Sequence, residues 1–586
     1  MIRRILVGLA AIATAALAPP AAQAAPPPPF GHACTPEDGV LFCPTADDGQ
    51  RVPSFDGVPL DVDVTLPPTG DGPFPTIVML HGWGGSKDTF ESHSPAGGYN
   101  NVFYAQRGYA VVNLTARGWG RSCGTIGSRS SPECDRGWIH LADHRYEERD
   151  IQHLLGLLVD QGVTRARSIG VTGVSYGGIQ TLNLARLRDR VRRPDGSFVR
   201  WRSPNGTPLR ITAGYARWPG SDLSYALQPN GRFIDSRAPR RNEAIRPGGV
   251  MKKSYNDVLY NSGVAGGFYQ PPGGAFSADL TTWKLLADRG EPERRDALAV
   301  GRELSRFHSW VGLSGPSAAL IVQNGWTDDL FPAPEALRVY RTFKPAPGAR
   351  LSLQLGDLGH PRGSNHPSVS AAMIAQANSF FDFYLKGRGR GRAPRHGSVL
   401  AYTQACPGYG ADATAGYLAA TWERLHPRSV AMRHRRPLAM SSEGGAPATA
   451  AAFDPITGGG RACATVPAER APGTATIQRR FRKPFTLLGM PTVESRIRTK
   501  GRGGFIAARL WDVHGGQQLL VSRGVYRLQD NQRGPIAFQL FGNGWRFAKG
   551  HTAKLELLGR DPNFLRTSDF KFSVRFARTR VQLPGR

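Results

Sequence analysis

Residues 168–184, SIGVTGVSYGGIQTLNL, decide the fold of this chain. The first half of the stretch is apolar and β-prone, the second half is helix-like, and Ser175 stands between glycines where one gives way to the other. Residues 173–177, GVSYG, fit the pattern G-x-S-x-G, in which a serine occupies a strained turn between a strand and a helix. We interpret Ser175 as a nucleophile. The alternative is a glycine-rich turn with a solvent-facing serine.

Strand and helix patterns alternate on both sides of this stretch. Residues 56–67, DGVPLDVDVTLP, alternate apolar and polar residues, as an antiparallel, half-buried strand does. Apolar residues between 145 and 160 recur on one face of a helix. This alternation predicts an α/β layer architecture with a parallel sheet. The other expected strands are 76–80, 109–114, 169–174, 211–215, 318–323 and 351–355, and the other expected helices are 334–343 and 369–385.

The pattern loosens between about residues 224 and 314, where helical stretches at 278–289 and 293–307 lead us to expect an inserted, mostly helical cap. The run of glycine and arginine at 387–392 is typical of a solvated linker. Beyond it, β-prone runs at 505–511, 519–522 and 571–576 predict a separate all-β sandwich. We therefore expect a catalytic domain over residues 25–390 and a β-sandwich over residues 397–586.

The N-terminus has the pattern of a secretory signal. Arg3 and Arg4 precede the apolar run ILVGLAAIATAALA, and the small residues Ala22-Gln23-Ala24 precede a proline run. A signal peptide over residues 1–24 is therefore expected, with a secreted or envelope-associated mature protein. An uncleaved membrane anchor is the alternative, but the apolar part is shorter than the roughly 20 residues that span a bilayer.

Six cysteines agree with export, because disulfides persist in oxidising compartments. We expect each to pair with its sequence neighbour, although six cysteines allow many other connectivities. A zinc site is the alternative, but the sequence has no C-x-x-C and no nearby cluster of histidines, so no metal is expected. The expected pairs are Cys34 with Cys43, Cys123 with Cys134, and Cys406 with Cys463.

The net charge of +29 is unusual for a globular protein of 586 residues. Arginine supplies most of it and is spread along the chain, whereas a nucleic-acid-binding protein concentrates its charge beside a recognisable motif. We therefore expect no nucleic-acid partner. The charge favours electrostatic association with anionic envelope polymers or membrane surfaces. The alternative is a solvated, arginine-biased surface that serves solubility.

A serine nucleophile needs a base, and the base needs an orienting acid. Where a G-x-S-x-G turn begins a helix, the chain order is Ser, then Asp or Glu, then His. Residues 325–329, GWTDD, follow directly on an apolar strand, and a proline comes four residues after Asp328. We therefore predict Asp328 as the acid. Asp329 is interpreted as a carboxylate that caps the next helix.

His360 ends the run LGDLGH at residues 355–360, just past the next expected strand. Its expected role is to take the Ser175 proton and return it to the leaving group. His366 is the second choice, but it begins the next helical stretch.

The tetrahedral intermediate of such a reaction needs hydrogen-bond donors for its oxyanion. Residues 81–85, HGWGG, end the first core strand and supply a loop of backbone N–H groups. We predict an oxyanion hole made of the main-chain amides of Trp83 and Tyr176. His81 is interpreted as a structural loop residue. No metal or nucleotide motif appears, so no cofactor is expected.

These residues resemble a known family. DGVPLDVDVTLP, ARGWGRSCG, GVSYGG, NGWTDD and GDLGH are similar to the Xaa-Pro dipeptidyl-peptidase and cocaine-esterase-like family of serine hydrolases. LGMP, AARLWDVHGG and KGH, in the C-terminal half, are similar to that family's non-catalytic jelly-roll domain. The resemblance implies an α/β-hydrolase fold with a helical cap, followed by a jelly roll. It also implies Ser175, Asp328 and His360 as the catalytic triad.

The chain departs from the family pattern at the oxyanion loop. Members that resemble cocaine esterase carry a tyrosine near the first strand, and its hydroxyl assists the oxyanion. This chain has His81-Gly82-Trp83 there, which favours a hole made of backbone groups alone.

We expect a secreted serine hydrolase that cleaves a small-molecule ester or a short peptide through an acyl-enzyme. A dipeptidyl-peptidase must pair the substrate ammonium with carboxylates, because an unpaired buried charge is costly. Asp222 and Asp235 are candidates for this role, with surface solvation as the alternative. A competing hypothesis is a catalytically silent envelope-binding protein that uses the β-sandwich as its binding module, but the intact order of the triad argues against it.

Overall fold

The computed structural model describes residues 27–240, 242–290, 295–387, 389–459 and 461–586. The expected signal peptide, residues 1–24, lies outside the described residues. Within the described ranges, every helix is too short or too polar to cross a membrane.

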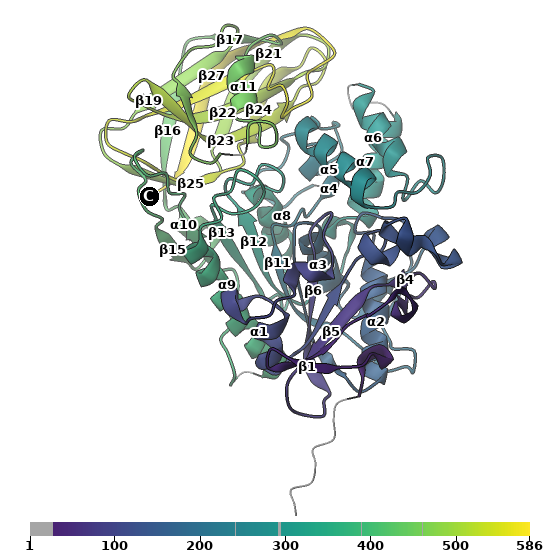
Figure 1. Ribbon diagram of the computed structural model, residues 1–586. Helices are drawn as coiled ribbons and strands as arrows, with labels where there is room; N and C mark the ends of the chain where they lie inside the picture. Colours follow the sequence, from purple (N-terminus) through teal and green to yellow (C-terminus); the bar gives the residue numbers. More distant parts are fainter. Residues whose placement is uncertain (1–26, 241, 291–294, 388, 460) are drawn as a thin grey trace, which may run out of the picture.

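An 11-stranded sheet forms the centre of the larger part of the molecule (Figure 1). Its order is β1-β2-β5-β7-β6-β8-β11-β12-β13-β14-β15, and the seven strands from β7 to β14 run parallel. At one edge, β1, β2 and β5 continue the sheet by antiparallel pairing, and at the other edge β15 pairs antiparallel with β14. The sheet has the parallel centre that the sequence predicts. The strands are β1 (Thr35–Glu37), β2 (Val40–Cys43), β5 (Val62–Leu66), β6 (Phe74–Leu80), β7 (Ala110–Leu114), β8 (Thr164–Val174), β11 (Ile211–Arg217), β12 (Ala319–Gly325), β13 (Leu351–Gly356), β14 (Val399–Tyr402) and β15 (Gly416–Ala419).

Helices cover both faces of this sheet. On one face, apolar side chains of α2 (Glu147–Asp160), α3 (Tyr176–Leu187) and α8 (Ala333–Phe343) belong to the same buried cluster as Val78 and Leu80 of β6. On the other face, α1 (Asn101–Gln106) and α9 (Pro367–Phe381) pack against the intervening residues of β6. Alternate residues of a strand point to opposite faces, so a central strand buried on both sides reads as an unbroken apolar run.

The large sheet extends beyond the boundary expected at residue 397. Strands β14 and β15 lie after the glycine- and arginine-rich run, yet β14 pairs in parallel with β13 and β15 returns antiparallel to it. Val399 and Ala401 are buried and alternate with half-buried residues, so β14 presents one face to the core of this layer. The second group of strands therefore begins at β16 (Arg428–His434).

A long segment with four α-helices among its described residues separates β11 from β12, where the sequence predicts an insertion. Figure 1 places these helices at the same end of the large sheet as the C-terminal strands. The predicted helix at 278–289 corresponds to α6, and the described part of the helix at 293–307 corresponds to α7. The helices are α4 (Leu223–Leu227), α5 (Lys253–Gly266), α6 (Leu280–Asp288) and α7 (Arg295–Phe307).

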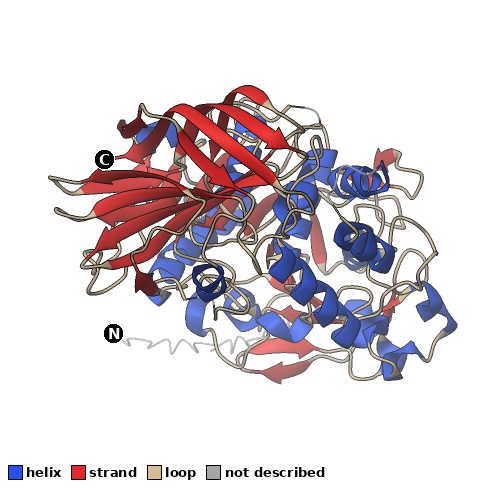
Figure 2. Cartoon of the chain, turned by 90° about the horizontal axis from the view of Figure 1, so that it is seen from above, coloured by secondary structure: helices blue, strands red, loops and turns tan. Residues whose placement is uncertain are grey.

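The C-terminal strands form two antiparallel sheets, seen at the upper left of Figure 2. One has the path β24-β21-β27-β20-β25, with β16 and β17 also paired to β27, and the other has the order β18-β23-β22-β26-β19. Apolar side chains from both sheets share one core, which includes Val493 and Leu510. The bounds are β17 (Leu438–Ser441), β18 (Thr465–Pro467), β19 (Ala475–Arg480), β20 (Phe485–Gly489), β21 (Thr492–Gly501), β22 (Phe505–His514), β23 (Gln517–Arg527), β24 (Arg533–Gln539), β25 (Asn543–Phe547), β26 (Thr552–Leu558) and β27 (Phe572–Gly585).

The C-terminal sheets and the large sheet are joined by a continuous core. Leu488 of β20 and the adjacent Met490 belong to the same buried cluster as Trp326, which follows β12. The indole N–H of Trp326 donates to the carbonyl oxygen of Tyr402 at 3.0 Å. A Cβ on Gly544 of β25 would lie 2.9 Å from that indole nitrogen, so the backbone of β25 passes directly against the tryptophan.

The structure contains the three expected disulfides, each between sequence neighbours. Their loops differ in length, because Cys34 and Cys43 are 9 residues apart whereas Cys406 and Cys463 are 57 apart. In the chain-entropy model, a cross-link that closes a longer loop removes more freedom from the unfolded chain.

We therefore expect that replacing Cys406 and Cys463 by alanine lowers the free energy of unfolding by about 4 kcal/mol, against about 2.5 kcal/mol for the Cys34 and Cys43 pair. Urea unfolding of the two double variants, followed by tryptophan fluorescence, measures the difference. A larger loss for the shorter loop would contradict the expectation.

Candidate active site

Ser175 lies on a sharp turn between β8 and α3, with φ 55° and ψ −113°. Residues other than glycine rarely adopt a positive φ, so the surrounding structure must hold this turn in place. A Cβ on Gly173 would lie 2.5 Å from the carbonyl oxygen of Leu80, and one on Gly177 would lie 2.1 Å from it. Glycine is therefore required at both positions, as the motif predicts.

The structure brings the three predicted triad residues together. Ser175 Oγ lies 2.8 Å from His360 Nε2, and His360 Nδ1 lies 2.7 Å from Asp328 Oδ2. The imidazole is 16% exposed and the carboxylate is fully buried. Both distances are hydrogen-bonding distances, so the three groups form one continuous chain.

The carboxylate of Asp328 is fixed on both oxygens. Oδ1 accepts hydrogen bonds from the N–H groups of Leu330 and Phe331, both at 2.9 Å, and the N–H of His360 reaches Oδ2 at 3.3 Å. A Cβ on Gly359 would lie 2.3 Å from Oδ2, and Gly359 has a φ of 110°. The glycine before His360 therefore lets the loop close over the acid.

Both residues predicted to supply the oxyanion donors lie beside Ser175. The N–H of Tyr176 is the first of helix α3, where a backbone N–H has no partner within the helix. The loop that carries Trp83 lies against the serine, because a Cβ on Gly82 would stand 3.8 Å from the Ser175 Cβ. The Trp83 indole donates to the carbonyl oxygen of Leu259 in α5 at 2.9 Å, which ties the oxyanion loop to the inserted helices.

The His81 side chain stabilises this loop through hydrogen bonds to the backbone. The N–H of Ala116 donates to His81 Nε2 at 2.9 Å, so the proton is on Nδ1, which donates to the carbonyl oxygen of Gly82 at 2.7 Å. Burial lowers the pKa of His81 to about 4, and the ring is uncharged at neutral pH. Both nitrogens are used by the backbone, in agreement with a structural loop residue.

Glu147 lies behind Tyr176, and the sequence analysis did not single it out. The Tyr176 hydroxyl donates to Glu147 Oε1 at 3.1 Å, and the N–H of His140 donates to the same oxygen at 2.7 Å. Burial and the nearby Asp143 raise the pKa of Glu147 to about 7. This carboxyl anchors the first residue of α3 beside the nucleophile.

Asp329 is not a helix cap, contrary to the sequence interpretation. Its carboxylate accepts from Arg362 Nε at 2.8 Å and lies 3.4 Å from Nε of Arg523, which comes from β23 of the C-terminal sheets. Helix α8 begins after Pro332 without a side-chain cap. Burial would raise the pKa of Asp329, but the two guanidinium groups outweigh it and hold that pKa below its usual value.

The ion pairs of Asp329 with Arg362 and Arg523, here called the Asp329 bridge, connect two of the loops that carry triad residues. Asp329 follows the acid Asp328 directly, and Arg362 comes two residues after the base His360. The side chains of Asp329, Arg362 and Arg523 are all at least 98% buried. A charge in such surroundings must keep its partner, so the positions of the acid and base loops depend on one another and on β23.

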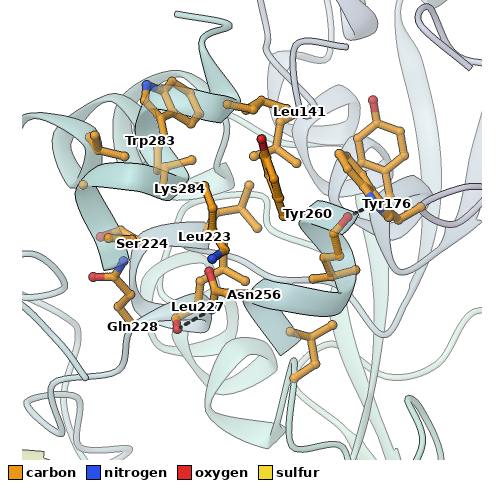
Figure 3. Close-up of a pocket in the computed structure, with 18 of the residues that line it drawn as sticks. Leu141, Tyr176, Leu223, Ser224, Leu227, Gln228, Asn256, Tyr260, Trp283 and Lys284 are labelled. Carbon is orange, nitrogen blue, oxygen red and sulfur yellow. Dashed lines mark hydrogen bonds between the residues drawn. The ribbon is translucent and has the colours of Figure 1, made fainter. Parts of the chain in front are cut away.

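Ser175 lines a pocket of about 140 Å³. Figure 3 shows other residues that surround this pocket. Its walls are mostly apolar and aromatic. They come from the start of α3, from α4 to α7, and from loops that include Trp83, Leu141 and Phe331. Among the described lining residues, Lys284 is the one with a charged side chain, and it is already paired with Asp257 at 2.9 Å. Residues that surround the space include Leu141, Tyr176, Leu223, Tyr260, Trp283 and Phe331.

The two carboxylates considered for a substrate ammonium do not line this pocket. Asp222 caps α4 and accepts from Ser305 Oγ at 2.8 Å, whereas Asp235 accepts from the Trp422 indole at 2.7 Å. His366 is exposed at the start of α9 and contacts Ser368 instead of the serine. The alternative interpretation of Asp222 as a solvated surface residue is also wrong, because this residue is only 3% exposed.

Comparison with known proteins agrees with this geometry. Residues 56–192 match the model of the X-Pro dipeptidyl-peptidase (S15) family. Dipeptidyl aminopeptidase BIII of Pseudoxanthomonas mexicana is 28% identical over 138 residues, which cover 23% of this chain and 18% of that protein. The match to this curated relative thus spans under a fifth of its length.

Solved structures resemble nearly the whole chain at low identity. A CocE/NonD family hydrolase from Staphylococcus aureus matches with a TM-score of 0.57 and 14% identity, covering 93% of each chain. An α-amino acid ester hydrolase matches with a TM-score of 0.58 and 15% identity, covering 94% of this chain and 97% of that one. An aminopeptidase from a marine sediment Thaumarchaeota archaeon matches with a TM-score of 0.57 and 14% identity, with the same coverage.

The S15 match covers strands β5 to β8, helix α3 and the sharp turn at Ser175 between them, which we call the elbow. The structural matches extend the likeness through the C-terminal sheets. The family resemblance predicted from the motifs is thereby confirmed: the chain is similar to the X-Pro dipeptidyl-peptidases of the S15 family over residues 56–192 and shares the fold of CocE/NonD hydrolases.

Proposed function

We propose that this protein is a serine hydrolase that cleaves an ester or amide with an apolar acyl group through an acyl-enzyme. One observation carries the proposal: the hydrogen-bonded chain from Ser175 through His360 to Asp328 ends at an apolar pocket. The relatives named above are hydrolases of peptides or esters, and this disfavours the alternative of a silent envelope-binding protein.

In the proposed reaction, Ser175 Oγ attacks the substrate carbonyl while His360 Nε2 takes its proton. The resulting oxyanion accepts hydrogen bonds from the N–H groups of Trp83 and Tyr176. His360 then gives the proton to the leaving alcohol or amine. A water molecule, activated by the same imidazole, hydrolyses the acyl-enzyme and restores the Ser175 hydroxyl. Asp328 keeps the proton on His360 Nδ1 throughout.

The pocket supports an acyl group without a free ammonium. A dipeptidyl-peptidase buries the substrate N-terminus, and the described pocket walls offer it no carboxylate. The volume of about 140 Å³ is close to the roughly 150 Å³ of an apolar cavity that binds benzene. We therefore propose a short or ring-sized acyl group as the preferred one.

We propose further that α4 to α7 act as a cap and that the C-terminal sheets are a non-catalytic jelly roll. The cap is supported by the pocket residues that these helices contribute, and the jelly roll by the two packed antiparallel sheets and the motif resemblance. Secretion is proposed from the N-terminal pattern and from three disulfides, which persist in oxidising compartments.

Replacing Ser175 or His360 by alanine is expected to abolish turnover, by as much as ~10⁶-fold, because the triad acts as a unit. A fluorophosphonate probe should label the wild type and not Ser175→Ala. The matched control is His366→Ala, which removes an exposed histidine and should keep full activity. Failure of the wild-type protein to label, or a loss of turnover below about tenfold in either triad variant, would contradict the proposed mechanism.

We expect kcat/KM for p-nitrophenyl butyrate to exceed that for Gly-Pro-p-nitroanilide by about 100-fold or more, because the peptide must bury an unpaired ammonium. Acetyl-Gly-Pro-p-nitroanilide, which lacks that charge, should react faster than the free peptide. If the free dipeptide were the best of the three substrates, the chain would be an exopeptidase instead.

Arg523→Met should lower the free energy of unfolding by about 3 kcal/mol, because it leaves the buried Asp329 with one guanidinium partner instead of two. Turnover should also fall by about tenfold to 100-fold, since a small displacement of the acid loop misplaces His360. Arg496→Met, an exposed change on β21, serves as the control in urea unfolding and ester hydrolysis. Full turnover in Arg523→Met would limit the bridge to a purely structural role.

A further inference from the structure

A second cavity, of about 880 Å³, lies on the opposite side of helix α7 from the serine pocket. Val300 and Leu304 of this helix line the serine pocket, whereas Arg302 and Arg306 line the second cavity. A Cβ on Gly301 would lie 3.1 Å from both Ile245 and Ser224, so the helix packs closely between the two spaces. The cavity is therefore a separate site and not an extension of the serine pocket.

Three arginines line this cavity without an ion-pair partner among the described residues. Arg302 and Arg306 are one turn apart on the same face of α7, and Arg240 comes from the segment opposite. All three are exposed, and within the described part of the chain their guanidinium groups have no hydrogen-bond or ion-pair partner. Like charges one turn apart repel each other, so an anion between them would be stabilised.

The carboxylates that line the cavity are already engaged elsewhere. Asp222 caps α4 and accepts from Ser305, Glu243 pairs with Arg237, and Glu303 accepts from Arg145 at 2.6 Å. None of these three contacts involves Arg240, Arg302 or Arg306. The cavity therefore keeps an excess of positive charge in spite of its acidic residues.

The inner end of the cavity is aromatic and holds a buried guanidinium. Arg338 is 2% exposed, and its guanidinium carbon lies 4.6 Å from the Tyr225 ring centre and 4.9 Å from that of Phe233. Its Nη1 donates to Glu335 Oε2 at 2.8 Å, but its Nη2 has no partner among the described residues. The indole nitrogen of Trp310, 1% exposed, is likewise a buried donor without a described partner.

We propose that this cavity binds an organic anion with an aromatic or apolar body and a carboxylate or phosphate group. The volume lies in the range that suits a small organic ligand. Aromatic walls suit the body, and the forked donors of arginine suit the oxygens of a carboxylate or phosphate. The site takes its ligand independently of Ser175, so it goes beyond the proposed hydrolase activity.

The test is isothermal titration of the full chain with phenyl phosphate and with benzoate, which distinguish the two acid groups. Inorganic phosphate supplies the charge without the body, and benzyl alcohol the body without the charge. We expect saturable binding of phenyl phosphate or benzoate, at least about tenfold tighter than either fragment. Ser175→Ala leaves the walls of the serine pocket intact, so the variants at Arg302 and Arg306 distinguish the two sites, whatever the outcome for the proposed reaction.

The double variant R302Q/R306Q should weaken binding by about 100-fold, because each charge-assisted hydrogen bond contributes about tenfold. The matched control R496Q/R498Q removes the same charge from the exposed face of β21 and should bind like the wild type. Both pairs are exposed, so the fold and the hydrolysis of a neutral ester should be unchanged. Absence of saturable binding, equal affinity in R302Q/R306Q, or equal loss in the control pair would overturn the proposal.

Discussion

The close approach of the elbow glycines to two neighbouring strands is the constraint on which the site depends. Gly173 and Gly177 stand against the Leu80 carbonyl, and a Cβ on Gly178 would lie 2.4 Å from the Arg217 carbonyl oxygen. The Ser175 N–H donates to that same Arg217 oxygen at 2.9 Å. Packing and hydrogen bonding together therefore hold a backbone conformation that an isolated turn would abandon.

Parallel pairing places every other part of the site relative to that turn. Strand β6 leads into the oxyanion loop, β8 into Ser175, β12 into Asp328 and β13 into His360. The carboxyl ends of parallel strands meet at one edge of a sheet, so residues far apart in sequence converge there. The Asp329 bridge then sets the distance between the acid and base loops from the side of the C-terminal sheets.

Local sequence was sufficient to predict the turn at Ser175, the acid Asp328 and the base His360, because each lies in a short motif that follows a recognisable apolar strand. It was not sufficient where the outcome depends on a distant partner. The role of Asp329 is decided by Arg523, nearly 200 positions later, whose only signal is a charged residue inside the apolar run of β23. The place of β14 is likewise decided by its pairing with β13, which no feature of residues 399–402 specifies.

The pocket beside Ser175 is another feature that local sequence did not predict. Its walls come from α3 to α7 and from several loops, and the aromatic residues involved were visible in the sequence only as scattered positions. Asp222 was a reasonable partner for an ammonium by composition alone. Its actual use as a helix cap follows from the backbone of α4, which the loosened pattern after residue 224 did not reveal.

The position of Arg523 bears on how such a chain can evolve. A β-sheet module appended to an enzyme is ordinarily free to be exchanged between lineages, because its loss leaves the catalytic machinery complete. Here the appended module supplies one of the two guanidinium groups around a buried acid beside the triad. Any recombinant that imported foreign sheets would have to preserve a cation at this place, so selection acts on the two halves as a single inherited unit.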